Sequence, residues 1–214
     1  MQILELFSGT GSLGKGFSNA LVTSVDVNPR FDPTFLCDIM DFDYKQFDSF
    51  DYIHASPPCT EYSINQASFY GRRRRVGGIL TDFNPDVHET QLKQADALVL
   101  KAIEIIDHFK PACWTIENPY SNWRCSLKQR PFMSEYDFAR VDYCMYTDPV
   151  LTKKPTMFFN NFGLKLSLCD KNHDHLHWDK LPGGGGNPYT RYVIPHRLCV
   201  EIAKQVTDVV YKHT

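Results

Sequence analysis

The hydrophobic positions of this chain occur as short continuous runs separated by longer stretches with helical spacing. Short apolar runs bounded by Gly, Pro or polar residues are typical of strands buried in a sheet. Six runs have this form: residues 2–7, 22–26, 51–56, 112–116, 138–145 and 156–159. Because helical stretches alternate with these runs, the pattern predicts a mostly parallel sheet covered on both faces, an α/β fold.

Three stretches predict helices. From Glu89 to Phe109 apolar side chains recur every three or four residues, and Lys110-Pro111 ends the pattern. A second helical stretch is expected after the turn at 8–12, up to about Leu21, and a third runs from Val200 to Val210. In open sheets of this kind ligands bind beyond the carboxyl ends of the strands. The strand ends are therefore the places to search for a site.

Composition narrows the class of protein. The 214 residues, 43% of them hydrophobic, suffice for one substantial core, so we expect a single domain spanning 1–214. A net charge of −2 implies that any contact with nucleic acid uses a local basic surface. Seven singly scattered Cys indicate free thiols in a reducing compartment, the cytoplasm. We expect neither a membrane span nor secretion, because no apolar run approaches about 20 residues and the start lacks a signal-like segment.

A glycine-rich turn, Ser8-Gly9-Thr10-Gly11-Ser12, follows the first predicted strand. Glycines let the backbone approach a ligand closely, with amide groups pointing at it. Asp26, which closes the second predicted strand, suits a ribose with two free hydroxyls. NAD and S-adenosylmethionine both satisfy this pattern. The turn therefore predicts a nucleoside cofactor without choosing between the two.

Ser56-Pro57-Pro58-Cys59 places a thiol on a rigid turn directly after a strand. The two prolines restrict the backbone and so aim the side chain. A thiolate is a strong nucleophile toward a polarised carbon such as C6 of a pyrimidine. The usual role of a free cysteine, packing in the core, is assigned instead to Cys37, Cys113, Cys144 and Cys199.

Glu117 closes another predicted strand, within Trp114-Thr-Ile-Glu-Asn-Pro119. A carboxyl group that donates to N3 of a pyrimidine withdraws electrons from the ring and favours attack at C6. The apolar neighbours Trp114 and Ile116 predict a raised pKa for Glu117. Taken alone, Glu117 would be interpreted as an exposed helix-cap or loop carboxylate.

In their order along the chain, these motifs resemble the cytosine-C5 DNA methyltransferase family, especially its short phage and viral members. The stretch 7–13 resembles the family's first cofactor motif, Asp26-Val27 its ribose and adenine pair, and Asp38-Ile39 its contact to the adenine amine. The stretch 56–59 resembles the catalytic cysteine loop, and Glu117-Asn118 the catalytic acid motif. Residues 189–198 resemble the final motif, which packs back on the cofactor site.

The resemblance implies a Rossmann-like class I fold, S-adenosylmethionine as cofactor, and DNA as partner, in the cytoplasm or nucleus of a host. It implies that the target cytosine is flipped out of the helix, that Cys59 adds to C6 while Glu117 assists at N3, and that C5 takes the methyl group. A base then removes the C5 proton and Cys59 is released. The cofactor contacts so implied are Phe7, Ser8, Gly9, Thr10, Gly11, Ser12, Leu13, Asp26, Val27, Asp38, Ile39 and Pro57. The substrate contacts are Ser56, Pro58, Asn118, Pro119, Lys154, Arg72, Arg73, Arg74 and Arg75.

The chain departs from the family in two places. Where the family carries a Gln-Arg-x-Arg pattern, this chain has Lys153-Lys154-Pro-Thr, so that Lys154 would replace an arginine fork with a point charge. Where larger members insert a target-recognition domain, only a short insertion, 161–188, is present. We therefore expect short or loose sequence specificity, or specificity supplied by a partner.

Several alternatives stay open on the sequence. One is a catalytically weak or inactive DNA-binding homologue, and another is a C5 methyltransferase that acts on tRNA or on a free nucleotide. A third, an NAD-dependent oxidoreductase, lacks an evident hydride-transfer His/Asp or Tyr-x3-Lys arrangement.

Two further clusters carry expectations. The run 72–75, with aromatic residues nearby, is predicted to be a loop that contacts DNA phosphates and that moves on hinges at Gly71, Gly77 and Gly78; a solvated charged loop is the alternative. Cys169, His173, His175 and His177 are spaced like metal ligands. Structural zinc usually draws its ligands from two separated pairs, so we expect a polar DNA-facing loop here and no metal.

Overall fold

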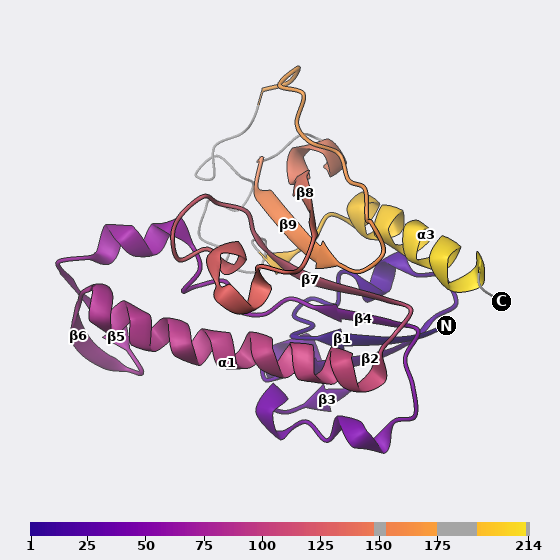
Figure 1. The fold of residues 1–214 in the computed structure, drawn as a ribbon, viewed down its shortest axis with the longest axis horizontal. Helices are drawn as coiled ribbons and strands as arrows, with labels where there is room; N and C mark the ends of the chain where they lie inside the picture. The colour runs from indigo at the N-terminus through magenta and orange to yellow at the C-terminus, as the bar shows by residue number, and fades with distance from the viewer. Residues whose placement is uncertain (148–152, 175–191, 213–214) are drawn as a thin grey trace.

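The computed structural model describes residues 1–147, 153–174 and 192–212, arranged around one seven-stranded sheet (Figure 1). The strand order is β3-β2-β1-β4-β7-β9-β8. These strands are β1 Gln2–Leu6, β2 Leu21–Asp26, β3 Phe35–Leu36, β4 Tyr52–Ala55, β7 Cys113–Pro119, β8 Phe138–Asp142 and β9 Pro155–Asn160. A separate hairpin is formed by β5 Arg72–Val76 and β6 Ile79–Phe83.

The structure also contains two long helices and several short 3-10 helices. The long helices are α1 Pro85–Phe109 and α3 His196–Lys212. The short ones are η1 Gly14–Gly16, η2 Pro29–Phe31, η3 Ile39–Asp41, η4 Tyr44–Gln46, η5 Ile64–Phe69, η6 Leu127–Gln129, η7 Pro131–Met133 and η8 Tyr143–Tyr146. Asn84 begins α1 by accepting a hydrogen bond from the amide of Val87 at 2.9 Å, and Pro85 occupies the first helical position, where its missing N–H costs nothing.

The strand directions define the fold class. β1 pairs in parallel with β2 and β4, β2 with β3, and β4 with β7. β9 runs antiparallel to both of its neighbours, β7 and β8. A mostly parallel sheet in this order, with one reversed strand near an edge, is the Rossmann-like class I methyltransferase fold. The predicted fold class is confirmed.

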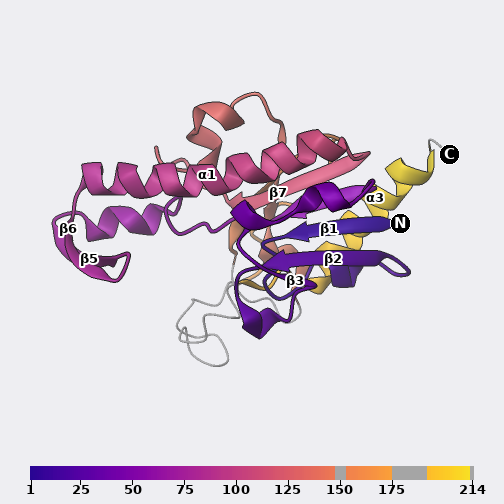
Figure 2. The same ribbon diagram turned by 90° about the horizontal axis from the view of Figure 1, so that it is seen from below.

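Each face of the sheet packs against one long helix, because side chains alternate along a strand. Leu4 and Ile53 face a core that includes Leu92 and Val99 of α1. Their strand neighbours face the opposite core, with Leu198, Ile202 and Val206 of α3. Figures 1 and 2 show α1 running along the sheet and continuing past the carboxyl ends of the strands to the β5–β6 hairpin. Within the described residues, no helix is both long and apolar enough to cross a bilayer.

The helix expected between the glycine turn and Leu21 is wrong: only the single turn η1 forms there. Glycines at 9, 11, 14 and 16 give this stretch a low helix propensity. Tertiary packing also prevents a longer helix, since a Cβ at Gly16 would lie 2.6 Å from the backbone carbonyl carbon of Cys199 on α3. The stretch therefore packs against α3 as a compact turn.

The loop predicted for 72–75 is also wrong, because these residues form β5. Gly77 and Gly78 both have positive φ, 56° and 85°, which suits the two-residue turn of a β-hairpin. The strand predicted at 138–145 ends at Asp142, where η8 begins. Of the predicted insertion, residues 161–174 contain no helix or strand, and 175–188 lie outside the described residues.

Candidate active site

The carboxyl ends of β1, β2, β4 and β7 open into one cavity of about 1170 Å³. Most of the predicted site residues line it: Phe7, Ser8, Gly9, Thr10, Ser12, Asp26, Val27, Asp38, Ile39, Ser56, Pro57, Pro58, Cys59, Glu117, Pro119 and Lys154. A single small-molecule pocket usually measures roughly 300–1,000 Å³. This cavity therefore has room for a nucleoside-sized ligand beside a second planar group.

The glycine turn forms one end of the cavity and is held by Asp26. Phe7, Gly9 and Gly11 have φ values of 54°, 49° and 61°, which reverse the chain sharply after β1. The amide of Gly9 donates to Asp26 Oδ2 at 2.7 Å, and the amide of Asn28 donates to Asp26 Oδ1 at 2.8 Å. Each carboxylate oxygen accepts more than one hydrogen bond, so the oriented carboxylate can still receive two hydroxyls of a ligand.

Residues from the two ends of the chain meet at this cofactor end. The amide of Ile194 donates to Ser12 Oγ at 3.3 Å, and Tyr192 and Ile194 both line the cavity. The part of the predicted final motif at 192–198 thus lies beside the glycine turn. Its first three residues, 189–191, lie outside the described residues. Asp38 lines the same end, where its carboxylate also caps η3 by accepting from the amide of Met40 at 2.9 Å.

Cys59 and Glu117 lie at the other end of the cavity, on the loop after β4 and at the end of β7. β4 and β7 are neighbouring parallel strands with Ala55 opposite Ile116, so their ends come together. Asn118 also joins the two ends, because its Nδ2 donates to the carbonyl of Pro57 at 3.3 Å. The sheet therefore brings together the thiol and the carboxyl that were predicted from separate motifs.

The electrostatics of this pair are dominated by burial. The pKa of the Cys59 thiol is raised to about 11, first by burial and then by the charge of Glu117, while Lys154 opposes both effects. Burial likewise raises the pKa of Glu117, against the charge of Lys154 and a 3.4 Å hydrogen bond donated by Tyr143. Because both shifts favour the neutral forms, the resting site holds a thiol beside a carboxyl whose protonated form is favoured.

Lys154 is the cation that acts on both Cys59 and Glu117. It lies close enough to Cys59 and to Glu117 to lower the pKa of both groups. Its ammonium group also lies 4.7 Å from the centroid of the Tyr143 ring. The prediction that Lys154 belongs to the site agrees with this position, although a lysine offers a point charge where the family carries a planar fork.

Two residues of the site have no obvious signal in the sequence. Glu5 lies on β1, lines the cavity and accepts hydrogen bonds from the amides of Leu13 and Gly14, both at 3.3 Å. Tyr143 follows β8 and reaches Glu117 from a distant part of the chain. Each stands in an apolar stretch, where strand periodicity accounts for its neighbours without indicating a function.

Other predicted residues do not line the cavity. Leu13 is in the core at 1% exposure, and Gly11 contributes to the turn through its positive φ. Asn118 is fully buried beneath the site. The four arginines lie on β5.

Arg74 differs from its neighbours because it points inward. Its guanidinium pairs with Glu61 at 2.9 Å, donates to Gln66 at 2.6 Å and lies 4.8 Å from the Phe83 ring centroid. Gln66 itself lines the cavity. Arg74 therefore ties the hairpin to the segment that follows Cys59, whereas Arg72, Arg73 and Arg75 are exposed.

Comparison with known proteins connects this geometry to a family. No family model matches the chain. A protein of Frog virus 3 (isolate Goorha), described as a probable DNA (cytosine-5)-methyltransferase, is 27% identical over 222 residues, which cover 94% of this chain and 98% of that protein.

A solved structure, described as a "putative DNA modification methyltransferase" encoded within an E. coli prophage, matches with a TM-score of 0.47 and 15% identity. It covers 75% of this chain, and this chain spans 46% of its length. The strand order of the sheet by itself defines the fold class of this chain. The match to the viral protein extends over nearly all of both chains and agrees with the ordered motifs, so the chain is similar along its length to a probable DNA (cytosine-5)-methyltransferase.

Proposed function

We propose that this chain is a DNA (cytosine-5-)-methyltransferase that transfers the methyl group of S-adenosylmethionine to C5 of a flipped-out cytosine through a covalent adduct with Cys59. The observation that carries the proposal is one cavity with the glycine turn and Asp26 at one end and Cys59, Glu117 and Lys154 at the other. We further propose that the chain is one catalytic domain, with 161–188 as a short insertion.

The cofactor end fits an adenosine-containing methyl donor. The backbone of the turn approaches the cavity without a side chain at Gly9, and Asp26 is oriented by two amides. In the proposal, Asp26 receives the ribose hydroxyls, while Val27, Asp38 and Ile39 hold the adenine. When bound, S-adenosylmethionine supplies an electrophilic methyl group beside the site of Cys59.

The chain's own residues then divide the work. Glu117, whose protonated form is favoured by burial, donates its proton toward N3 and withdraws electrons from the ring. Cys59 loses its proton to solvent, and its sulfur bonds to C6, so that the electron pair of the C5–C6 double bond becomes available at C5 for methylation. Lys154 stabilises the thiolate electrostatically. A base then takes the C5 proton, the double bond re-forms, and the bond between C6 and the Cys59 sulfur breaks.

The test is a methyl-transfer assay with tritiated S-adenosylmethionine on mixed-sequence DNA. We expect Cys59→Ser to lower transfer on the order of 10³-fold or more, because the nucleophile is lost, while its affinity for S-adenosylmethionine is unchanged. Cys125→Ser removes a buried thiol that lies away from the cavity, so it should transfer at the wild-type rate. A Cys59→Ser protein that methylates DNA at a substantial rate would exclude the covalent role of this thiol.

Parallel assays separate the alternatives. Transfer to RNA or to deoxycytidine monophosphate, but not to DNA, would identify a C5 methyltransferase with another substrate. Wild-type protein that binds S-adenosylmethionine and transfers to none of the three would be an inactive homologue. Bisulfite sequencing of a plasmid expressed with the protein then reports the modified base and its sequence context together.

A further inference from the structure

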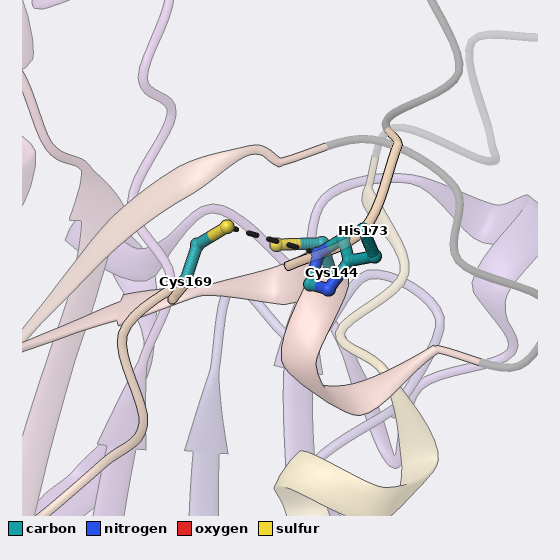
Figure 3. Close-up of side chains that lie close together, drawn as sticks. All are labelled: Cys144, Cys169 and His173. Atoms are coloured by element: carbon teal, nitrogen blue, oxygen red, sulfur yellow. Dashed lines mark hydrogen bonds between the residues drawn. The ribbon is translucent and has the colours of Figure 1, made fainter. Parts of the chain in front are cut away.

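Outside the cavity, two cysteines and a histidine point toward one another at the edge of the sheet (Figure 3). Cys144 belongs to η8, directly after the edge strand β8, and is buried at 2% exposure. Cys169 and His173 come from the 161–174 segment that follows β9, and both are partly exposed. The two sulfurs and one imidazole nitrogen all lie within 4.8 Å of one another.

The spacing of these atoms is that of metal ligands. A tetrahedral zinc ion binds sulfur at about 2.3 Å and histidine nitrogen at about 2.0–2.1 Å, which separates two ligand atoms by about 3.5–3.8 Å. The Sγ of Cys169 lies 3.7 Å from Nε2 of His173. A small movement of the Cys144 sulfur would place the three ligand atoms at the corners of one face of a tetrahedron.

The surroundings of the cluster are those that a metal site needs. A ligating histidine usually directs its second ring nitrogen at a carboxylate, which fixes the ring and raises its basicity. Nδ1 of His173 lies 3.8 Å from Oδ1 of Asp170. The amide of Lys171 donates to the Sγ of Cys169 at 3.4 Å, a contact that stabilises a thiolate. A plain thiol–imidazole contact would need neither feature.

We propose that Cys144, Cys169 and His173 bind a zinc-class divalent ion, with Asp170 as the outer partner of His173. Two thiolates and an imidazole are the ligand set that zinc prefers over magnesium or calcium. On binding, each thiol loses its proton to solvent and each sulfur gives an electron pair to the metal, with no change of oxidation state. The fourth position stays open in this assignment.

The structure assigns this site a mechanical role. The metal would fasten the 161–174 segment to the edge of the sheet, where Asp142 already accepts a hydrogen bond from the amide of Cys169 at 3.0 Å. Oδ2 of Asp142 also lies 3.8 Å from the ammonium group of Lys153, which lines the active-site cavity. Loss of the metal would therefore loosen the segment that precedes the site lysine, Lys154.

The sequence alone led to the opposite expectation, because it showed one cysteine near several histidines and no second pair. The missing thiol comes from Cys144, 25 positions before Cys169 and assigned above to the core. His175 and His177 of the predicted cluster lie outside the described residues. The inference is independent of the proposed methyl transfer, since its measurements need no activity.

The experiment measures the metal content of the full chain, purified under reducing conditions, loaded with zinc and dialysed. Elemental analysis should give about one zinc per chain for the wild type and below about a tenth for Cys169→Ser, because a two-ligand remnant binds weakly. Cys37→Ser, also partly exposed but outside the cluster, should keep about one zinc per chain. Asp170→Asn should weaken zinc affinity by about 10–100-fold, as loss of an outer-shell carboxylate does.

Cobalt provides a second readout. The spectrum of bound cobalt would not change if Cys169 had a role in packing only. Cobalt-loaded wild type should show the visible absorption of a tetrahedral ion and a thiolate charge-transfer band, and Cys169→Ser should lose the band. Folded, reduced wild type that retains no zinc would overturn the proposal, as would Cys169→Ser that retains as much as wild type. The mass of the purified wild type is a further check. A mass lower by two hydrogens would show a disulfide between Cys144 and Cys169 in place of a metal site, and would also overturn the proposal.

Discussion

Lys154 occupies the position that decides how the thiol and the carboxyl share protons. Chemistry at a pyrimidine needs a thiolate at Cys59 and a protonated Glu117 at the same moment. Burial opposes the first requirement and supports the second, whereas the charge of Lys154 acts in the other direction on both groups. Their titrations therefore belong to the pair, and one ammonium group tunes both.

Replacing Lys154 should move the whole pH profile of methyl transfer. Lys154→Met removes the cation, so the pKa of Cys59 and the pKa of Glu117 both rise, and both limbs of the kcat/KM profile should shift toward higher pH by about one unit. Lys154→Arg keeps the charge and should leave the limbs near their wild-type positions. The measurement is kcat/KM across the pH range of both limbs.

Lys45→Met provides the matched control, because Lys45 also lies over a tyrosine ring, at 5.9 Å from the Tyr44 centroid, but away from the cavity. It should not displace either limb. If Lys154→Met and wild type gave superimposable profiles, Lys154 would have no electrostatic role in the reaction.

At the scale of elements, β1 and the turn that follows it form one unit held by a buried acid. Glu5 is 3% exposed, and burial raises its pKa to about 7 in spite of hydrogen bonds from the amides of Leu13 and Gly14. These bonds hold the entry to η1 against the strand, while Asp26 holds Gly9. The end of the cavity formed by the glycine turn is therefore shaped by two carboxyl groups on neighbouring strands.

Glu5 should make stability fall as pH rises. Its folded-state pKa, about 7, is above the unfolded value of 4.5, so the folded protein binds the proton more tightly. The stabilisation is fully present below pH 4.5 and is lost as pH rises through about 7, in total about 3 kcal/mol. The side chain in Glu5→Gln does not titrate. The free energy of unfolding of wild type minus that of the variant should therefore fall by this amount as the pH rises from 4.5 to above 7.

Urea unfolding at several pH values between these limits measures that difference. An unchanged dependence of the unfolding free energy on urea concentration would show that both proteins unfold from comparable states. A difference that stays constant with pH would mean that Glu5 is not held in the neutral form by the fold.

At the scale of the whole molecule, the β5–β6 hairpin lies at the start of α1, far from α3 (Figure 1). Arg74 fastens it to the segment after Cys59, and three exposed arginines remain on its surface. Since the net charge of the chain is −2, this hairpin is a local basic surface of the kind that binds a phosphate backbone. Its anchoring in the fold makes it a structured surface and not the loop that the arginine run suggested.

Removing two of these exposed arginines should weaken DNA binding in a salt-dependent way. For the double variant Arg72→Ala, Arg75→Ala, we expect the slope of log affinity against log salt concentration to decrease in magnitude by about 1–2, since each phosphate contact contributes about 0.9. Lys212→Ala, at the end of α3, should leave the slope unchanged. Equal slopes for the double variant and wild type, measured by fluorescence anisotropy, would show that the hairpin does not contact the backbone.

The sequence by itself determined the local parts of this protein. Apolar runs predicted β1, β4 and β9 nearly as the structure has them. A few consecutive apolar residues are enough to indicate that a stretch is a buried strand. The Pro-Pro-Cys turn and the acid near the end of β7 were also visible, since proline stiffness and strand ends are local. In the same way, the order of the motifs was enough to indicate the family.

Only the tertiary structure decided which of these parts meet. Strand order places the loop after β4 beside the end of β7, and so brings Cys59 to Glu117. It brings Tyr143 to the same carboxyl, and Cys144 to Cys169 and His173. It also packs Gly16 against α3, where only η1 forms, and it pairs the arginine run with β6 as a strand. The reason is physical: contacts between distant residues depend on pairing and packing of whole elements, which no local pattern contains.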